Sequence, residues 1–290
     1  MLVTFCSYKP EVGCTMAAVN IGILLCQDFA KRVLIVDFNF AAPRLAGAVQ
    51  EISEPPQSSL FDFFVTYQKA IDGDLPITGD SSFLTPPGVN ATSVDGFDYL
   101  PASKQRSVLK GLVAFDWNVF YRDYYGGALI EEIKNHWVHA YDYVFVTSGK
   151  GFTDSASICT VQLADVIVLM MDASPDSFEG SLELARRVNA GRIKRDRKTV
   201  RILPVRTRVN MAERELYIRN RQRIENAFSE YLPRQFDVAK YFDEVQIPES
   251  PYFAATNDIA VLKEKRHALS ISRSYGLLSQ YVLDMPSLLS

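Results

Sequence analysis

The chain has 290 residues, 48% of them hydrophobic, which is enough to bury roughly three quarters of the unfolded surface in a single α/β domain over residues 1–290. No apolar run approaches the ~18–20 residues of a membrane span, and the first residues do not form a signal peptide, so we expect a cytoplasmic protein. The four cysteines lack C-x-x-C spacing, which favours buried thiols over disulfides or a metal site.

The first 45 residues predict a β-loop-α-β unit. Residues 2–6 are an apolar, β-branched strand, and residues 9–15 follow as a loop. Apolar residues then recur at helical spacing over 16–29, and a second apolar strand over 32–37 ends in Asp37. The loop therefore lies where a phosphate-binding P-loop would lie, with free backbone N–H groups and a helix dipole that favour an anion.

Residues 51–95 predict an irregular insertion because much of this stretch is rich in Pro, Gly, Ser, Thr and Asp. Within it, residues 59–67 predict a short aromatic helix, capped by Ser59 and packed on the domain edge. A surface that binds a partner is the alternative interpretation of these aromatic residues.

The rest of the chain alternates between strands and helices. Strands are predicted at 97–101, 143–147, 166–171 and 200–205, and helices at 128–140, 177–187, 213–231 and 270–283. The strand at 143–147 is apolar on both faces, as a central parallel strand should be. This order predicts a doubly wound, mostly parallel sheet flanked by helices, with ligands at the carboxyl ends of the strands.

Four ordered motifs, at residues 5–17, 36–45, 141–154 and 158–165, resemble one known family. They are similar to a bacterial branch of the ParA/MinD class of deviant Walker P-loop ATPases, whose loop reads F-x-S-x-K-G-G-V-G-R-T-M. The similarity spans nearly the whole chain. It implies the ParA/MinD fold, and members of this family are dimeric ATP-driven switches.

The resemblance also implies a nucleotide site. It places Lys9 at the signature lysine, Gly13 at the last loop glycine and Thr15 at the hydroxyl that binds the metal. Asp37 matches an acidic residue near the attacking water and the metal. Asn210 ends a segment that lies near the nucleotide base in the relatives, and residues 247–248 begin the segment that returns near the adenine.

Several family positions carry the wrong chemistry for ATP hydrolysis. Pro10 and Glu11 replace two loop glycines. Cys14 replaces the basic residue of the loop, which is arginine in this branch and, in the K-G-G-x-G-K-S/T pattern of the wider class, the lysine that reaches the phosphates. Asn39 and Thr147 replace two aspartates, of which the second is the Walker B residue. These changes remove charge compensation and Mg²⁺ placement, so we expect no cofactor, with ATP and Mg²⁺ as the ligands if a nucleotide site survives. The Cys14 thiol, at a helix N-terminus, is expected to have a lowered pKa.

Charge is unevenly distributed along the sequence. Residues 186–223 hold 14 of the 31 Lys and Arg residues but only 3 of the 34 acidic residues, in a chain of net charge −3. Five residues of this stretch are the candidate contacts to an anionic partner: Arg192, Lys194, Arg195, Arg197 and Lys198. A solvated helix face, non-specific DNA binding and binding to an acidic protein all remain open.

The leading hypothesis is a degenerate ParA/MinD-like protein, a pseudo-ATPase that serves as a binding or scaffold subunit of a bacterial regulatory or defence complex. Its partner would be another protein, or a second subunit of a homo- or heterodimer bound through the P-loop face. One alternative is a slow ATP-hydrolysing switch that uses Lys9, Thr15 and Asp37. The other is a non-specific DNA-binding module that works through residues 186–223.

Overall fold

The computed structural model describes residues 1–73, 86–104, 115–268 and 270–289. These residues build one eight-stranded sheet in the order β3-β4-β2-β5-β1-β6-β7-β8. The strands are β1 (Leu2–Cys6), β2 (Val33–Asp37), β3 (Asn90–Ala91), β4 (Phe97–Leu100), β5 (Tyr143–Thr147), β6 (Val166–Met171), β7 (Arg201–Val209) and β8 (Gln246–Pro248). Neighbouring strands pair in parallel except β3 and β4, so the predicted doubly wound, mostly parallel sheet is confirmed.

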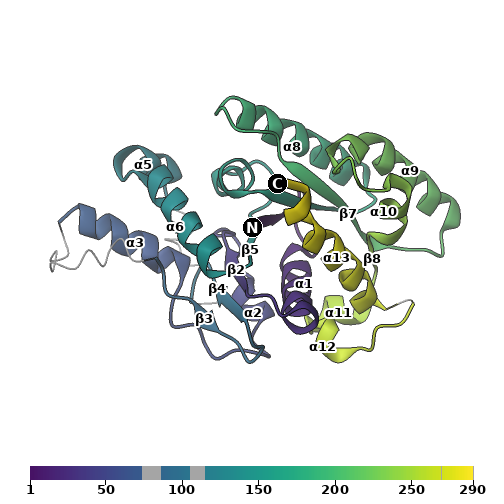
Figure 1. Cartoon of the computed structure of the whole chain (residues 1–290), viewed down its shortest axis with the longest axis horizontal. Coiled ribbons are helices and arrows are strands. Elements are labelled where there is room, and N and C mark those ends of the chain that lie inside the picture. Colours follow the sequence, from purple (N-terminus) through teal and green to yellow (C-terminus); the bar gives the residue numbers. More distant parts are fainter. Residues whose placement is uncertain (74–85, 105–114, 269, 290) are drawn as a thin grey trace.

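Helices cover both faces of this sheet (Figure 1). On one face α1 (Cys14–Phe29) lies beside α13 (Ile271–Leu289). On the other face an aromatic-rich core joins β2, β4 and β5 to α3 (Leu60–Ile71), α5 (Trp117–Asp123) and α6 (Gly126–Ala140). The larger core includes β6 and β7 together with residues of α8 (Pro175–Ile193), α9 (Arg214–Phe228) and α10 (Val238–Glu244). Every residue of β1, β2, β5 and β6 is buried, because both faces of these strands are covered.

Shorter helical segments complete the described chain. They are α2 (Leu45–Ala48), α7 (Asp154–Ser157), the π-helix η2 (Ile158–Leu163), the 3₁₀ turn η3 (Ser229–Tyr231), α11 (Pro251–Thr256) and α12 (Ala260–Lys263). Among the described residues, no helix combines the length and the apolar character needed to cross a membrane.

The segment predicted as an irregular insertion contains regular structure. The aromatic helix is α3, whose Ser59 Oγ accepts a hydrogen bond from the Asp62 N–H, 3.3 Å away, as the predicted cap requires. Phe64 is buried in the aromatic core rather than offered to a partner. The two-residue strand β3 follows at Asn90, and residues 74–85 of the predicted insertion lie outside the described residues.

Candidate functional site

The carboxyl ends of β1, β2, β5 and β6 meet at one edge of the sheet. The loop from Ser7 to Gly13 follows β1, and Asp172 follows β6. Asp37 and Thr147 end neighbouring strands and face each other in the β2–β5 register. The parallel sheet therefore brings together Asp37, Thr147 and the loop, which the resemblance places in a nucleotide site, and adds Asp172 to them.

Asp37 is 1% exposed, and four donors of the chain surround its carboxylate. Oδ1 accepts from the Asn39 N–H at 2.9 Å and from the Thr147 hydroxyl at 2.9 Å. Oδ2 accepts from the N–H groups of Arg44 at 3.1 Å and Leu45 at 3.3 Å. Asp37 thereby fixes the turn between β2 and α2 and ties it to the end of β5.

These four bonds use all the acceptor positions that a carboxylate offers. Burial raises the pKa of Asp37, while hydrogen bonds from Asn39, Thr147, Leu45 and Arg44 act in the opposite direction. Thr147, at the Walker B position of the family, donates to Asp37 and is itself 1% exposed. The pair acts here as a structural anchor.

Lys9 bonds within its own chain. Its Nζ donates to the Ser174 hydroxyl at 2.9 Å, and Ser174 Oγ donates to Asp172 Oδ1 at 2.5 Å. Burial alone would raise the pKa of Asp172, but hydrogen bonds from Ser174 and the charge of Lys9 lower it below its usual value. Lys9 thus connects the P-loop to the start of α8.

The P-loop has a left-handed backbone both at its retained glycine and at a position where the family glycine is replaced. Gly13 has φ 93° at the start of α1, and Glu11 has φ 63°, in the left-handed region that favours glycine. The Glu11 carboxylate is exposed, 3.5 Å from the Arg44 guanidinium. The Glu11 carbonyl accepts from Arg208 Nη2 at 2.7 Å.

The prediction that the Cys14 thiol has a lowered pKa is wrong. The thiol is half-buried against the larger core, and this burial raises its pKa to about 11, although a hydrogen bond with Ser7 opposes the shift. Desolvation of the thiolate therefore outweighs the helix N-terminus. Thr15 lies beside it in the first turn of α1, partly exposed. Asn39 stabilises the turn after β2, where its Oδ1 accepts from the Ala42 N–H at 3.2 Å.

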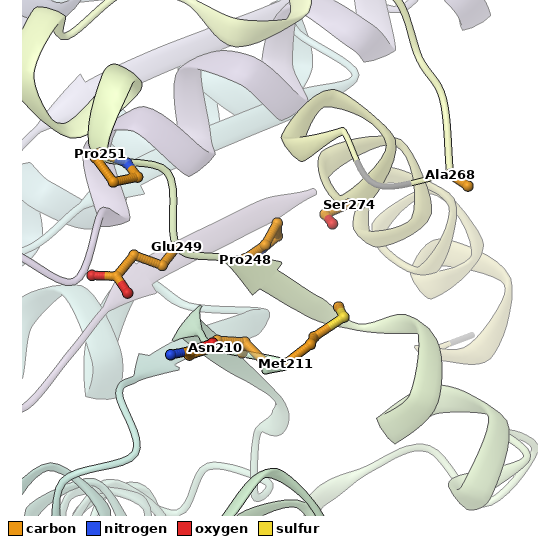
Figure 2. Close-up of a pocket in the computed structure, with 8 residues that line it drawn as sticks. Asn210, Met211, Pro248, Glu249, Pro251, Ala268 and Ser274 are labelled. Atoms are coloured by element: carbon orange, nitrogen blue, oxygen red, sulfur yellow. The ribbon is translucent and has the colours of Figure 1, made fainter. Parts of the chain in front are cut away.

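A hollow of about 330 Å³ lies farther along the same edge, past the ends of β7 and β8. Figure 2 shows Asn210 and Met211 on one side, and Pro248 and Glu249 on the other, with Ser274 of α13 nearby. The structure thus brings together the two segments that the resemblance placed near a nucleotide base. Asn210 Oδ1 accepts from the Ala212 N–H at 3.0 Å, which fixes the loop that lines the hollow.

The residues on the phosphate side do not fit a triphosphate with Mg²⁺. Cys14 provides no positive charge where the family has a lysine, and Glu11 adds a negative one at the loop. Asp37 has all its acceptor positions filled, and Thr147 donates to it. Within the described ranges, no group of three or more His, Cys, Asp or Glu residues is placed to hold a metal.

Two of the five candidate basic contacts bind the π-helix. Arg192 Nη1 donates to the carbonyls of Val161 at 3.1 Å and Ala164 at 2.9 Å, and Arg197 Nη1 donates to Gln162 at 2.6 Å. These carbonyls lie at the C-terminal end of η2, where backbone acceptors have no partner within the helix. The two arginines therefore stabilise the end of η2.

The other three candidates are exposed. Among the described residues, the side chains of Lys194, Arg195 and Lys198 have no carboxylate within ion-pair distance. Other arginines of the 186–223 stretch are engaged internally: Arg187 with Glu183, Arg206 with Phe242 and Gln246, Arg221 with Glu225 and Asp243, and Arg223 with Glu179. Of the five candidates, the three exposed ones therefore lie in the turn after α8, and Arg186, Arg214 and Arg219 of the same stretch are exposed as well.

The sequence did not single out the groups that engage the P-loop. Ser174 and Asp172 follow the buried strand β6, so the rule that ligands gather at strand ends could have identified them. Arg44 belongs to the motif after β2, but nothing in its spacing connects it to Glu11. Arg208 lies far from Glu11 in sequence, and only the sheet order brings the two together.

No known family model matches the chain, and no curated protein matches it in sequence. Solved structures do match: MinD of Pyrococcus furiosus, described as a cell division ATPase, is 13% identical, with a TM-score of 0.62 and coverage of 98% of both chains. A plasmid partition protein from Borrelia burgdorferi bound to AMPPNP is 14% identical, with a TM-score of 0.63 and coverage of 98% of both chains. Apo McdA of Cyanothece is 16% identical, with a TM-score of 0.66, covering 97% of this chain and 98% of that chain. The chain therefore has the fold of the ParA and MinD proteins.

Proposed function

We propose that this chain is a ParA/MinD-like protein without ATPase activity that serves as a binding or scaffold subunit of a bacterial regulatory or defence complex. The observation that carries the proposal is the Asp37 carboxylate, whose four acceptor positions are filled by groups of its own chain. A carboxylate in this state has no position left to orient water or a hydrated metal. The motifs that resemble the bacterial branch of the family support the proposal that the complex is bacterial.

The P-loop face is the surface that we assign to a protein partner or a second subunit. Glu11, Arg44 and Lys150 are exposed there, so the face offers charges of both signs. Lys9 is bonded to Ser174 within its own chain, so contact of Lys9 with a second subunit would have to replace this bond. A slow ATP switch that relies on Lys9 and Asp37 would first have to break these contacts.

We predict that the full-length protein releases phosphate from Mg-ATP no faster than buffer does. The phosphate-binding lysine and the Walker B aspartate each stabilise charge in the transition state by roughly 3–4 kcal/mol, and neither residue is present. The measurement is phosphate release with excess Mg-ATP, with the Asp37→Asn variant assayed in parallel. Turnover in the parent that disappears in this variant would refute the proposal.

Nucleotide binding is tested separately by the thermal shift with millimolar Mg-ATP. A ligand that binds the native state raises the melting temperature by mass action. We expect no measurable rise for the parent, because Cys14 replaces the basic side chain that would bind the phosphates. The matched variant Pro10→Gly/Glu11→Gly/Cys14→Lys gives the loop the K-G-G-x-G-K-T pattern of the wider ParA/MinD class. A rise in melting temperature for this variant alone would assign the loss of nucleotide binding to these three residues. A large rise for the parent would contradict the expected loss of binding.

A second candidate function is contact with an anionic partner, favoured by the exposed turn after α8. Changing Lys194, Arg195 and Lys198 together to glutamate should weaken association with duplex DNA or with an acidic co-purifying protein. For DNA, log affinity should fall linearly with log salt; for a protein, charge reversal should matter more than bulk salt. Arg192 and Arg197 are left unchanged because they hold η2. Unchanged association with both partners would mean that the turn is only a solvated surface.

A further inference from the structure

Two strained residues from distant parts of the chain are joined by one hydrogen bond. Glu11 in the P-loop has φ 63°, and Arg208 near the end of β7 has φ 53°, both in the region that L-residues avoid. Arg208 Nη2 donates to the Glu11 carbonyl at 2.7 Å. Each such conformation costs about 1–2 kcal/mol, so it persists only where the surroundings hold it.

The structure around Arg208 shows how this conformation is held. The pairing of β7 with β8 shifts register between Arg206 and Val209, so Arg208 lies at an irregularity of the strand. The donor of this bond is charged, which favours it over a bond between neutral groups, although it lies at the exposed surface. The exposed Arg44–Glu11 ion pair, at 3.5 Å, adds little because water screens it.

The same strand end lines the hollow described above. Val209, Asn210 and Met211 follow Arg208 directly and form one wall, and the Val209 carbonyl accepts from the Glu249 N–H at 3.2 Å. A movement of this wall would move Arg208 with it. The Arg208 side chain thereby connects the P-loop to a wall of the hollow.

We propose that Arg208 is a latch that holds the P-loop closed and couples it to the segment 208–211 at the hollow. When the bond to Glu11 breaks, Glu11 loses the contact that holds its strained backbone, and the loop opens over the start of α1. This inference concerns loop conformation and is independent of whether the protein hydrolyses ATP.

Cys14, the first residue after the loop, reports on the latch. Cys6, Cys26 and Cys159 are buried, so Cys14 is the thiol on which reaction with an aromatic disulfide reagent is expected in the folded chain. Burial raises the pKa of Cys14 to about 11, which keeps its reaction slow at pH 8. Opening of the loop hydrates the thiol and returns its pKa towards about 8.5, which should speed its reaction roughly tenfold or more.

The experiment measures the Cys14 modification rate in the full-length chain. Arg208→Ala should react at least about tenfold faster than the parent, and Arg219→Ala, an exposed arginine on α9, should react at the parent rate. Arg208→Gly should react as fast as Arg208→Ala but without loss of thermal stability, because glycine accepts the positive φ. Cys14→Ser should abolish the signal.

Two outcomes would overturn the latch. The first is a parent-like rate in both Arg208→Ala and Arg208→Gly, with a native circular dichroism spectrum. The second is equal labelling of Cys6, Cys26 and Cys159 in these variants, because it would mean general loosening rather than opening of the P-loop.

Discussion

Replacing Asp37 with alanine is expected to lower the free energy of unfolding by about 3–5 kcal/mol. The change removes the acceptor for the N–H groups of Asn39, Arg44 and Leu45 and for the Thr147 hydroxyl, and it leaves these donors without their partner at a site that is 1% exposed. At about 2–4 °C per kcal/mol for a protein of this size class, the melting temperature should fall by about 10 °C. Denaturant titration and calorimetry measure both quantities.

A graded series separates a structural role from a catalytic one. Thr147→Val removes one donor and should cost about 1 kcal/mol, and Asp37→Asn keeps one carbonyl oxygen and should lie between this variant and Asp37→Ala. Asp95→Ala, at an exposed turn, is the control and should change stability by less than about 0.5 kcal/mol. If Asp37→Ala, Asp37→Asn and Thr147→Val have the same melting temperature as the parent and the control, the hydrogen bonds of Asp37 do not stabilise the fold.

The pH dependence of stability provides an independent check on Asp37. Burial raises its pKa in the folded state above the unfolded value, so the unfolded chain loses this proton first as the pH rises. Between the two pKa values the folded state binds more protons, and the contribution of Asp37 to stability falls with rising pH. This fall should be missing from the pH profile of Asp37→Ala.

Local pattern predicted most of the sheet. The apolar runs that became β1, β2, β5 and β6 are buried at every position, and a continuous apolar strand has no stable place except inside a parallel sheet. The strand β7 is less clear in the sequence, since Arg206 and Arg208 interrupt its apolar pattern. Arg206 is nevertheless 4% exposed, because its guanidinium donates to the Phe242 carbonyl and to Gln246.

Other elements depend on contacts that no local pattern reveals. The π-helix η2 has its terminal carbonyls bound by side chains from α8 and the turn after it, so its form depends on residues far along the chain. α5 begins after Asp116, whose Oδ1 accepts from the Val119 N–H at 3.0 Å, a cap that the sequence did not call attention to. Trp117 and Phe120 then bury this short helix in the aromatic core.

The sequence predicted where the residues of the candidate site lie, but not the hydrogen bonds and pKa values of their side chains. Strand order alone brings Asp37, Thr147 and the P-loop to one edge, so their proximity followed from topology. The partner of Lys9 could not be read from the sequence because Ser174 belongs to another element. The pKa of Cys14 depends on how deeply the thiol packs, and the sequence specified only its position at a helix N-terminus.

The basic stretch separates into two kinds of residue once the fold is known. A run of like charge in sequence is compatible with a solvated face or a binding patch, and both interpretations treat its members alike. In the structure Arg192 binds three backbone carbonyls, those of Val161, Ala164 and Lys198, whereas Lys194, two residues farther along the chain, is exposed. Part of the stretch therefore stabilises the fold, because Arg192 and Arg197 bind carbonyls at the end of η2.

This division predicts opposite results for neighbouring positions. Arg192→Ala should lower the free energy of unfolding by about 2 kcal/mol because carbonyls at the end of η2 lose a charged donor, whereas Lys194→Ala should change it by less than about 0.5 kcal/mol. Arg192→Lys keeps the charge but has one nitrogen where the guanidinium uses two, Nη1 on the η2 carbonyls and Nε on the Lys198 carbonyl, so it should recover less than half of the loss. Denaturant unfolding of the three variants measures these differences. Equal stabilities for Arg192→Ala and Lys194→Ala would show that Arg192 behaves like its solvated neighbour, and would return it to the set of candidate partner contacts.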